Sequence, residues 1–134
     1  MSGRQYTMAG SYPMEDRLTD QAKLKTILEW LSEKKAENIK VYDVHKTSSY
    51  TDLIVVCEGT ADVHNKAIAS HLIDMAKEHK LGVISKEGVE NGQWILIDTG
   101  DVIVHIFLPQ IRQHYKFDDL FEKVKSHHEQ ESES

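Results

Sequence analysis

Two apolar runs that meet at a short polar turn constrain the fold more than any other feature of the chain. The runs are WILI at 94–97 and VIVHIF at 102–107, and Asp98-Thr99-Gly100-Asp101 stands between them. A two-residue loop is the commonest connection in a β-hairpin. We therefore predict a hairpin whose loop is Thr99-Gly100.

The predicted hairpin has two different faces, because successive side chains of a strand point to opposite sides of the sheet. One face is aliphatic and carries Ile95, Ile97, Val102, Val104 and Ile106. The other, which we call the mixed face, carries Trp94, Leu96, Asp98, Asp101, Ile103, His105 and Phe107. We expect the aliphatic face in the core, while the mixed face has the composition of a protein-binding surface.

Two aspartates and a histidine on the mixed face raise the question of a reactive site. In the predicted register Asp98 lies opposite Asp101, and Trp94 lies opposite His105. His105 is then four residues, or about 13 Å, from Asp101 along the strand, too far to share a metal ion whose ligands lie within roughly 2–2.5 Å. The aspartates are either a catalytic carboxylate pair or, the favoured interpretation, solvated turn residues. His105 is either a packed edge of the core or part of a recognition surface.

The rest of the chain alternates between helical and strand patterns. Helices are predicted over 16–36, 61–80 and 111–125, and further strands over 39–44, 52–58 and within 81–88. The buried stripe of the second helix is predicted to contain Val63, Ala67, Ile68, Leu72, Ile73 and Ala76, with Thr60 as its N-cap. This order predicts an α/β fold: a single domain with a mixed, about five-stranded sheet flanked by helices.

The length of 134 residues suggests one domain, which we place at residues 15–125. Residues 1–14 have no apolar period and are predicted to be a disordered leader or an expression remnant. The polar residues 126–134 are predicted to be a disordered tail.

Composition narrows the class of function. The net charge of −6 without a dense basic stripe predicts little direct binding to nucleic acid. The longest apolar runs fall far short of the roughly 20 residues of a membrane span. The one cysteine, Cys57, lies in an apolar run, so we expect it to be buried in a protein of a reducing, cytoplasmic compartment.

No cofactor or metal motif is found, and we expect neither group. Gly59-Thr60 joins a strand to a helix, a place where phosphate can bind, but Glu58 and Asp62 flank it and would repel an anion. A strand-to-helix turn is therefore favoured there over a ligand-sensing site. The eight histidines follow no metal-binding spacing.

Three stretches carry a resemblance to a known family. They are TSSYTDLIVVCEGTADVHNKAIA at 47–69, GQWILIDTGDVIVHIF at 92–107 and IRQHYKFDDLF at 111–121. The sequence resembles the ribosomal silencing factors, the Iojap-like or RsfS family, over residues 17–125. The resemblance implies a protein that binds the large ribosomal subunit through ribosomal protein L14 at the intersubunit face. It would block joining with the small subunit and so repress translation, and organellar relatives assist large-subunit assembly.

The resemblance also implies a nucleotidyltransferase-like fold in a protein that is not an enzyme. Nucleotidyltransferases hold metal ions with acids at alternate strand positions. Here Asp52 could be the first acid, but Ile54 stands two residues later. A metal-dependent nucleotidyltransferase or nuclease is therefore the less favoured alternative.

We expect the partner to bind on the mixed face. Trp94 would be the aromatic anchor of this face, and Asp98 and Asp101 would pair with Lys or Arg of a basic ribosomal protein. The remaining predicted contacts are Leu96, His105 and Phe107, joined by Arg112 and Tyr115 from the last helix. The alternative for Arg112 and Tyr115 is that they only lock the last helix onto the sheet. In the free protein the same face could form a homodimer.

Overall fold

The computed structural model describes residues 14–47 and 51–122, with side chains from residue 21 onward. The elements are α1 (Met14–Glu33), β1 (Glu37–Asp43), β2 (Leu53–Glu58), α2 (Asp62–Glu78), β3 (Ser85–Glu87), β4 (Trp94–Asp98), β5 (Val102–Phe107) and α3 (Pro109–Tyr115). Apart from Met14, the predicted leader lies outside the described residues, as does the predicted tail at 126–134. Among the described helices, none is both long and apolar enough to span a membrane.

The five strands form one mixed sheet in the order β1-β2-β5-β4-β3. β2 and β5 pair in parallel at its centre, and the other neighbours pair antiparallel. Every residue of β2 and β5 is buried, as expected of central strands covered on both faces. The predicted α/β fold with a mixed five-stranded sheet is therefore confirmed.

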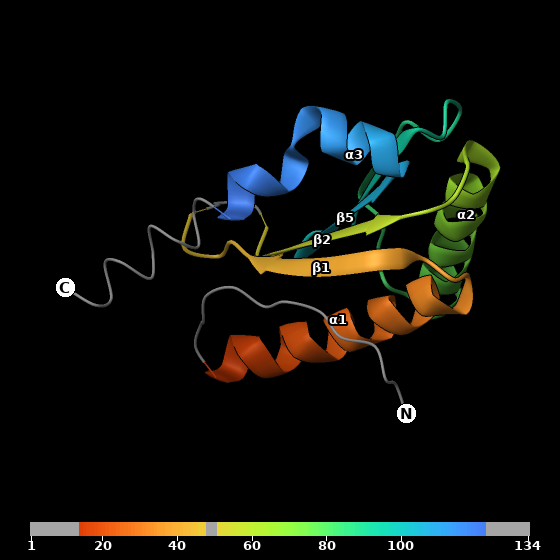
Figure 1. The fold of residues 1–134 in the computed structure, drawn as a ribbon. Helices are drawn as coiled ribbons and strands as arrows, with labels where there is room; N and C mark the ends of the chain where they lie inside the picture. Colours follow the sequence, from red (N-terminus) through yellow and green to blue (C-terminus); the bar gives the residue numbers. More distant parts are fainter. Residues whose placement is uncertain (1–13, 48–50, 123–134) are drawn as a thin grey trace.

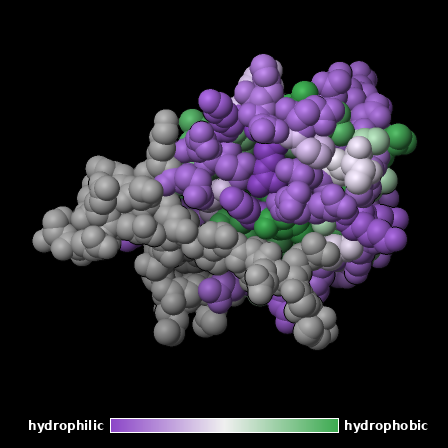
Figure 2. Space-filling view, in the orientation of Figure 1, coloured by the Kyte–Doolittle hydropathy of each residue, from purple (hydrophilic) through white to green (hydrophobic). Residues whose placement is uncertain are grey.

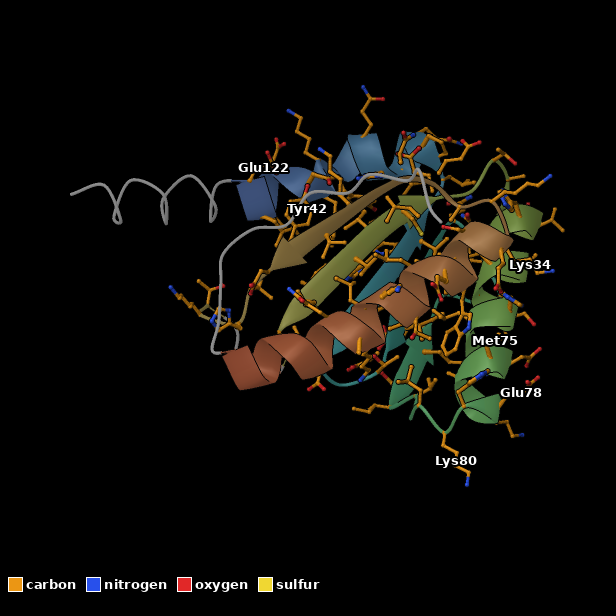
Figure 3. All side chains as sticks on the ribbon, turned by 90° about the horizontal axis from the view of Figure 1, so that it is seen from below. Lys34, Tyr42, Met75, Glu78, Lys80 and Glu122 are labelled. Carbon is orange, nitrogen blue, oxygen red and sulfur yellow. The ribbon has the colours of Figure 1, made fainter. Side chains whose placement is uncertain are left out.

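Helices α1 and α2 cover the aliphatic face of the sheet, and α3 lies on the opposite side (Figure 1). Ile95, Ile97, Val102, Val104 and Ile106 are all fully buried against α1 and α2. In Figure 3, which looks at the molecule from below, α1 crosses in front of the strands and α2 stands beside it. The prediction that the aliphatic face belongs to the core is confirmed.

The predicted buried stripe of α2 is wrong at two positions, Val63 and Ala67, both of which are exposed. Val63 is 70% exposed, whereas Asn65 is fully buried. Val63 and Ile68 are five residues, or about 500°, apart around a helix, which leaves them on different faces. Asn65 lies above Ile68 and Ala69 and therefore takes the buried position.

The hairpin is present, but its predicted register is wrong by two residues. Trp94 pairs with Phe107, not His105, and Asp98 pairs with Ile103, not Asp101. The loop is Gly100-Asp101, because the N–H of Thr99 donates to the carbonyl of Val102 at 2.9 Å. Gly100 has φ of +95°, which suits glycine at the first loop position. A shift of two residues keeps each strand side chain on its predicted face.

The predicted last helix is interrupted. α3 ends at Tyr115, Lys116 adopts the left-handed conformation with φ of +49°, and residues 117–122 are helical again. The amide of Lys116 donates to the carbonyl of Gln113. The break changes the direction of the chain above the mixed face.

Candidate protein-binding face

The mixed face is partly covered by α3 and the helical residues after it. Phe117 packs against Phe107, Val56 and Tyr42 in a second hydrophobic cluster, with Trp94, Ile111 and Phe121 at its border. Phe107 is fully buried and His105 is only 7% exposed. The predicted face is therefore open only along part of its length, toward β4 and the exposed side of α3.

Trp94 lies at the centre of the aromatic residues of this face. Its ring centroid is 4.8 Å from that of Phe107, 5.4 Å from Tyr115 and 5.7 Å from Phe117. The indole is half-buried, and Tyr115 beside it is 58% exposed. Trp94 and Tyr115 thus form a continuous aromatic surface that begins in the core and ends in solvent.

His105 holds Trp94 in place. The Nε1–H of Trp94 donates to Nδ1 of His105 at 3.0 Å. Burial lowers the pKa of His105 to about 4, so the imidazole is neutral near pH 7 and Nδ1 is available as the acceptor. Of the two interpretations left open by the sequence, the geometry supports a packed residue that orients the tryptophan.

The two aspartates of the turn do not form a carboxylate pair. Oδ1 of Asp98 accepts a hydrogen bond from the N–H of Gly100 at 2.8 Å. Oδ2 of Asp101 lies 3.8 Å from Nζ of Lys23, on the α1 side of the sheet. The geometry therefore supports turn residues, and only Asp98 remains beside the mixed face.

Strand β3 extends the open part of the mixed face. Glu87 pairs with Leu96, and Ser85 pairs with Asp98, so the side chains of each pair point to the same side of the sheet. Leu96 and Asp98 are half-exposed, and Glu87 is exposed. The sequence reasoning missed Glu87, because the register of β3 against β4 was not predicted.

Arg112 is buried at 7% exposure and binds within the protein. Its Nε and Nη2 donate to Oδ1 and Oδ2 of Asp118 at 2.7 and 2.9 Å. Its Nη1 donates to Oε2 of Glu58 at 3.0 Å and to the carbonyl of Asn38 at 2.8 Å. The sequence reasoning singled out Arg112 but missed these partners, which are distant in sequence or follow the unpredicted break at Lys116.

The turn at Gly59-Thr60 is built by contacts from α2. Thr60 is not the N-cap; Ala61 is, and it makes no side-chain cap hydrogen bond. Instead, the N–H of Thr60 donates to Nδ1 of His64 at 2.9 Å, and Nε2 of His64 contacts the carbonyl of Lys34 at 2.7 Å. These contacts join the start of α2 to the end of α1.

No group of three or more His, Cys, Asp or Glu side chains placed to hold a metal ion occurs in the described part of the chain. The side of the molecule seen in Figure 2 is mainly hydrophilic among its coloured residues, and hydrophobic residues reach the surface there only in small, separate areas. The mixed face combines the aromatic side chains of Trp94 and Tyr115 with Leu96 and nearby carboxylates. This combination is suited to binding a protein with apolar and basic groups.

Comparison with known proteins gives consistent matches. The family model described as "Ribosomal silencing factor during starvation" matches residues 17–134. The ribosomal silencing factor RsfS of Bacillus subtilis is 35% identical over 89 residues, which are 66% of this chain and 75% of that protein. The RsfS of Chromobacterium violaceum is 33% identical over 97 residues, covering 72% of this chain and 80% of that protein. A mouse protein named "Mitochondrial assembly of ribosomal large subunit protein 1" is 27% identical over 109 residues, covering 79% of this chain and 48% of that protein.

Solved structures show the same fold. A crystal structure of a protein from Chromobacterium violaceum superposes with a TM-score of 0.74 at 32% identity, covering 76% of this chain and 85% of that one. A crystal structure of a protein from Bacillus halodurans gives 0.69 at 32% identity, covering 75% of this chain and 93% of that one.

Proposed function

This chain belongs to the family of ribosomal silencing factors, and from that premise we propose that it binds the large ribosomal subunit through ribosomal protein L14. The bound domain occupies the face that meets the small subunit. It blocks subunit joining by its bulk and thereby represses translation in the cytoplasm.

The observation that carries this proposal is the aromatic surface of Trp94 and Tyr115 beside the half-exposed Leu96 and Asp98. Binding energy at protein interfaces concentrates in aromatic anchors surrounded by polar residues. The nearby carboxylates of Asp98 and Glu87, in a chain of net charge −6, favour a basic partner. Ribosomal proteins that contact ribosomal RNA are generally basic, since they neutralise phosphate charge.

The buried residues predicted to contact the partner have supporting roles in this proposal. Phe107 packs beneath Trp94, and His105 fixes the direction of the indole. Arg112 holds α3, which carries Tyr115. Direct contacts come from Trp94, Leu96, Asp98 and Tyr115. Asp101 is not among them, because it lies beside Lys23 on the α1 side of the sheet.

We infer a binding function without catalysis. The position that would supply the second acid of a nucleotidyltransferase is Ile54, which is 9% exposed and pairs with Ile103. A carboxylate pair for two metal ions is therefore missing from this strand. The relatives are named as silencing factors and as a large-subunit assembly protein. These names describe regulation or assembly and support a function without catalysis.

Co-sedimentation with purified large subunits tests the proposal. Trp94→Ala, Tyr115→Ala and Asp98→Lys should lose most of the pelleting seen with the unaltered chain, while circular dichroism shows each variant folded. Val63→Lys is the matched control for Tyr115→Ala, because Val63 is an apolar residue of α2 that is 70% exposed, comparable with 58% for Tyr115. Pelleting of all three variants at the level of the unaltered chain would refute the proposed surface.

A role in large-subunit assembly is part of the same proposal, and the name of the mouse relative supports it. Depletion of the protein should then lead to the accumulation of immature large subunits.

The aromatic surface also accounts for a proposed homodimer. In the absence of subunits, it pairs with a second copy of the chain. Light scattering should then show a dimer that Trp94→Ala converts to a monomer.

A further inference from the structure

The break at Lys116 allows two charged residues to meet that a continuous helix would keep apart. Residues 112 and 118 are six positions apart, or about 600° around a regular α-helix, which places them about 120° from a common face. Because Lys116 is left-handed, the chain turns and Asp118 faces Arg112. The result is a two-point contact of carboxylate and guanidinium at 2.7 and 2.9 Å.

A second irregular backbone position meets the same guanidinium from the sheet. Asn38 has φ of +51° and lies where the pairing of β1 with β2 shifts. Its carbonyl accepts from Nη1 of Arg112 at 2.8 Å, and its side-chain amide donates to Oε1 of Glu58 at 2.8 Å. Glu58 in turn accepts from Arg112 through Oε2. The first two strands thus present a prepared acceptor site to α3.

Tyr42 closes the arrangement from β1. Its hydroxyl donates to Oδ2 of Asp118 at 2.6 Å, and its ring stacks on Phe121 with centroids 5.1 Å apart. Figure 3 labels Tyr42 and Glu122 close together, at the end of the molecule where the C-terminal helical segment lies. The side chains of β1 and β2 therefore hold the chain both before and after the break.

The hydrogen bonds of this arrangement favour the charged forms of Asp118 and Arg112. Burial alone would raise the pKa of Asp118, but hydrogen bonds from Arg112 and Tyr42 outweigh it and hold that pKa below its usual value. Burial also favours a lower pKa for Arg112, and the hydrogen bond to Asp118 raises it instead. Removing one member would leave a partly buried charge without its partner, which is strongly unfavourable.

We propose that Tyr42, Glu58, Arg112 and Asp118 form a latch that positions Tyr115 against Trp94 and so shapes the docking face for the large subunit. Tyr115 lies between Arg112 and Asp118 in the chain, and its ring is 5.4 Å from that of Trp94. Arg112 is then a positioning residue, not a contact of the partner. The effect on binding rests on the proposed function, whereas the latch itself does not.

Hydrogen exchange measured by mass spectrometry tests the latch in the full chain. Arg112→Met and Asp118→Asn should speed amide exchange of residues 110–122 by about tenfold or more, while β5 keeps the exchange rate of the unaltered chain. The same variants should bind large subunits about tenfold more weakly. Asp119→Asn is the matched control, since Asp119 is exposed beside Asp118 and should change neither quantity.

The outcomes separate the two proposals. Unchanged exchange of residues 110–122 in both variants overturns the latch, and faster exchange with unaltered subunit binding overturns its positioning role. If Arg112→Met unfolds the whole domain, Tyr42→Phe decides, because it removes one hydroxyl and keeps the ring. That variant must speed exchange selectively in residues 110–122, or the latch is refuted. If the unaltered chain does not pellet with subunits, the proposed function fails, and the exchange result still decides the latch.

Discussion

The Nε1–H of Trp94 donates a hydrogen bond across 3.0 Å to Nδ1 of His105, two residues along β5 from its cross-strand neighbour Phe107. This contact requires an unprotonated Nδ1. The indole of a half-buried tryptophan thereby gains a hydrogen-bond partner, and its orientation depends on the charge state of a buried histidine.

Stability should fall in mild acid because of His105. Burial lowers its pKa from 6.5 to about 4, so between these values the unfolded chain binds a proton that the folded chain does not. The contribution of His105 to the free energy of unfolding is complete above pH 6.5 and is lost as the pH falls toward 4. It amounts to about 3 kcal/mol at most. Urea unfolding at several pH values should show a smaller pH dependence in His105→Asn, which retains an acceptor for Trp94. Equal pH dependence in the two proteins would contradict the assignment.

Gly59 should tolerate no side chain. A Cβ at this position would lie well inside contact distance of Oδ1 of Asn65 and 3.1 Å from Nδ1 of His64. Asn65 is buried and donates to the carbonyl of Gly92 at 2.8 Å, so it cannot move without losing that bond. We expect Gly59→Ala to lower the free energy of unfolding by about 1–3 kcal/mol. Gly82→Ala is the control, because a Cβ there has no neighbour within 4 Å; comparable losses at both sites would contradict the steric argument.

Lys23 should stabilise the hairpin loop more than its neighbour Asp101 does. The Nζ of Lys23 donates to the carbonyl of Thr99 at 2.7 Å and is mostly buried, so Lys23→Met should cost about 1–2 kcal/mol. The ion pair with the half-exposed Asp101 spans 3.8 Å, and Asp101→Asn should cost less than about 0.5 kcal/mol. Thermal unfolding of both variants measures the difference. A larger loss for Asp101→Asn would show that the ion pair dominates.

The faces of the sheet could be predicted from the sequence because side-chain alternation depends only on whether a residue is at an odd or even position. The two-residue error in register left Ile95 and Trp94 on their predicted sides. The register itself depended on which two of four turn residues make the loop. That choice is set by the positive φ of Gly100 and the hydrogen bond of Thr99 to Val102, neither of which the residue types alone decide.

The surroundings of Arg112 could not be predicted for a different reason. Glu58 and Asp118 meet this residue through tertiary packing, and no local pattern connects them. The helical break that makes the contact occurs at Lys116, where neither glycine nor proline marks it. Trp94, by contrast, could be selected from the side-chain alternation of the hairpin, whereas Tyr115 was selected from the family resemblance, and their 5.4 Å contact depends on the arrangement of α3.

The left-handed Lys116 offers the sharpest test of the break, because substitution by glycine should have opposite effects on stability at position 116 and at position 113. Glycine adopts a φ of +49° without the steric cost of about 1–2 kcal/mol that other residues bear. Lys116→Gly should therefore be neutral or stabilising by up to about 1 kcal/mol, while Lys116→Val should be destabilising by about 1–2 kcal/mol. Gln113→Gly is the matched control, since Gln113 is exposed within α3 and glycine there should cost about 1 kcal/mol. Chemical unfolding measures all three. A continuous helix through residue 116 would instead make Lys116→Gly as harmful as Gln113→Gly, and it would separate Asp118 from Arg112.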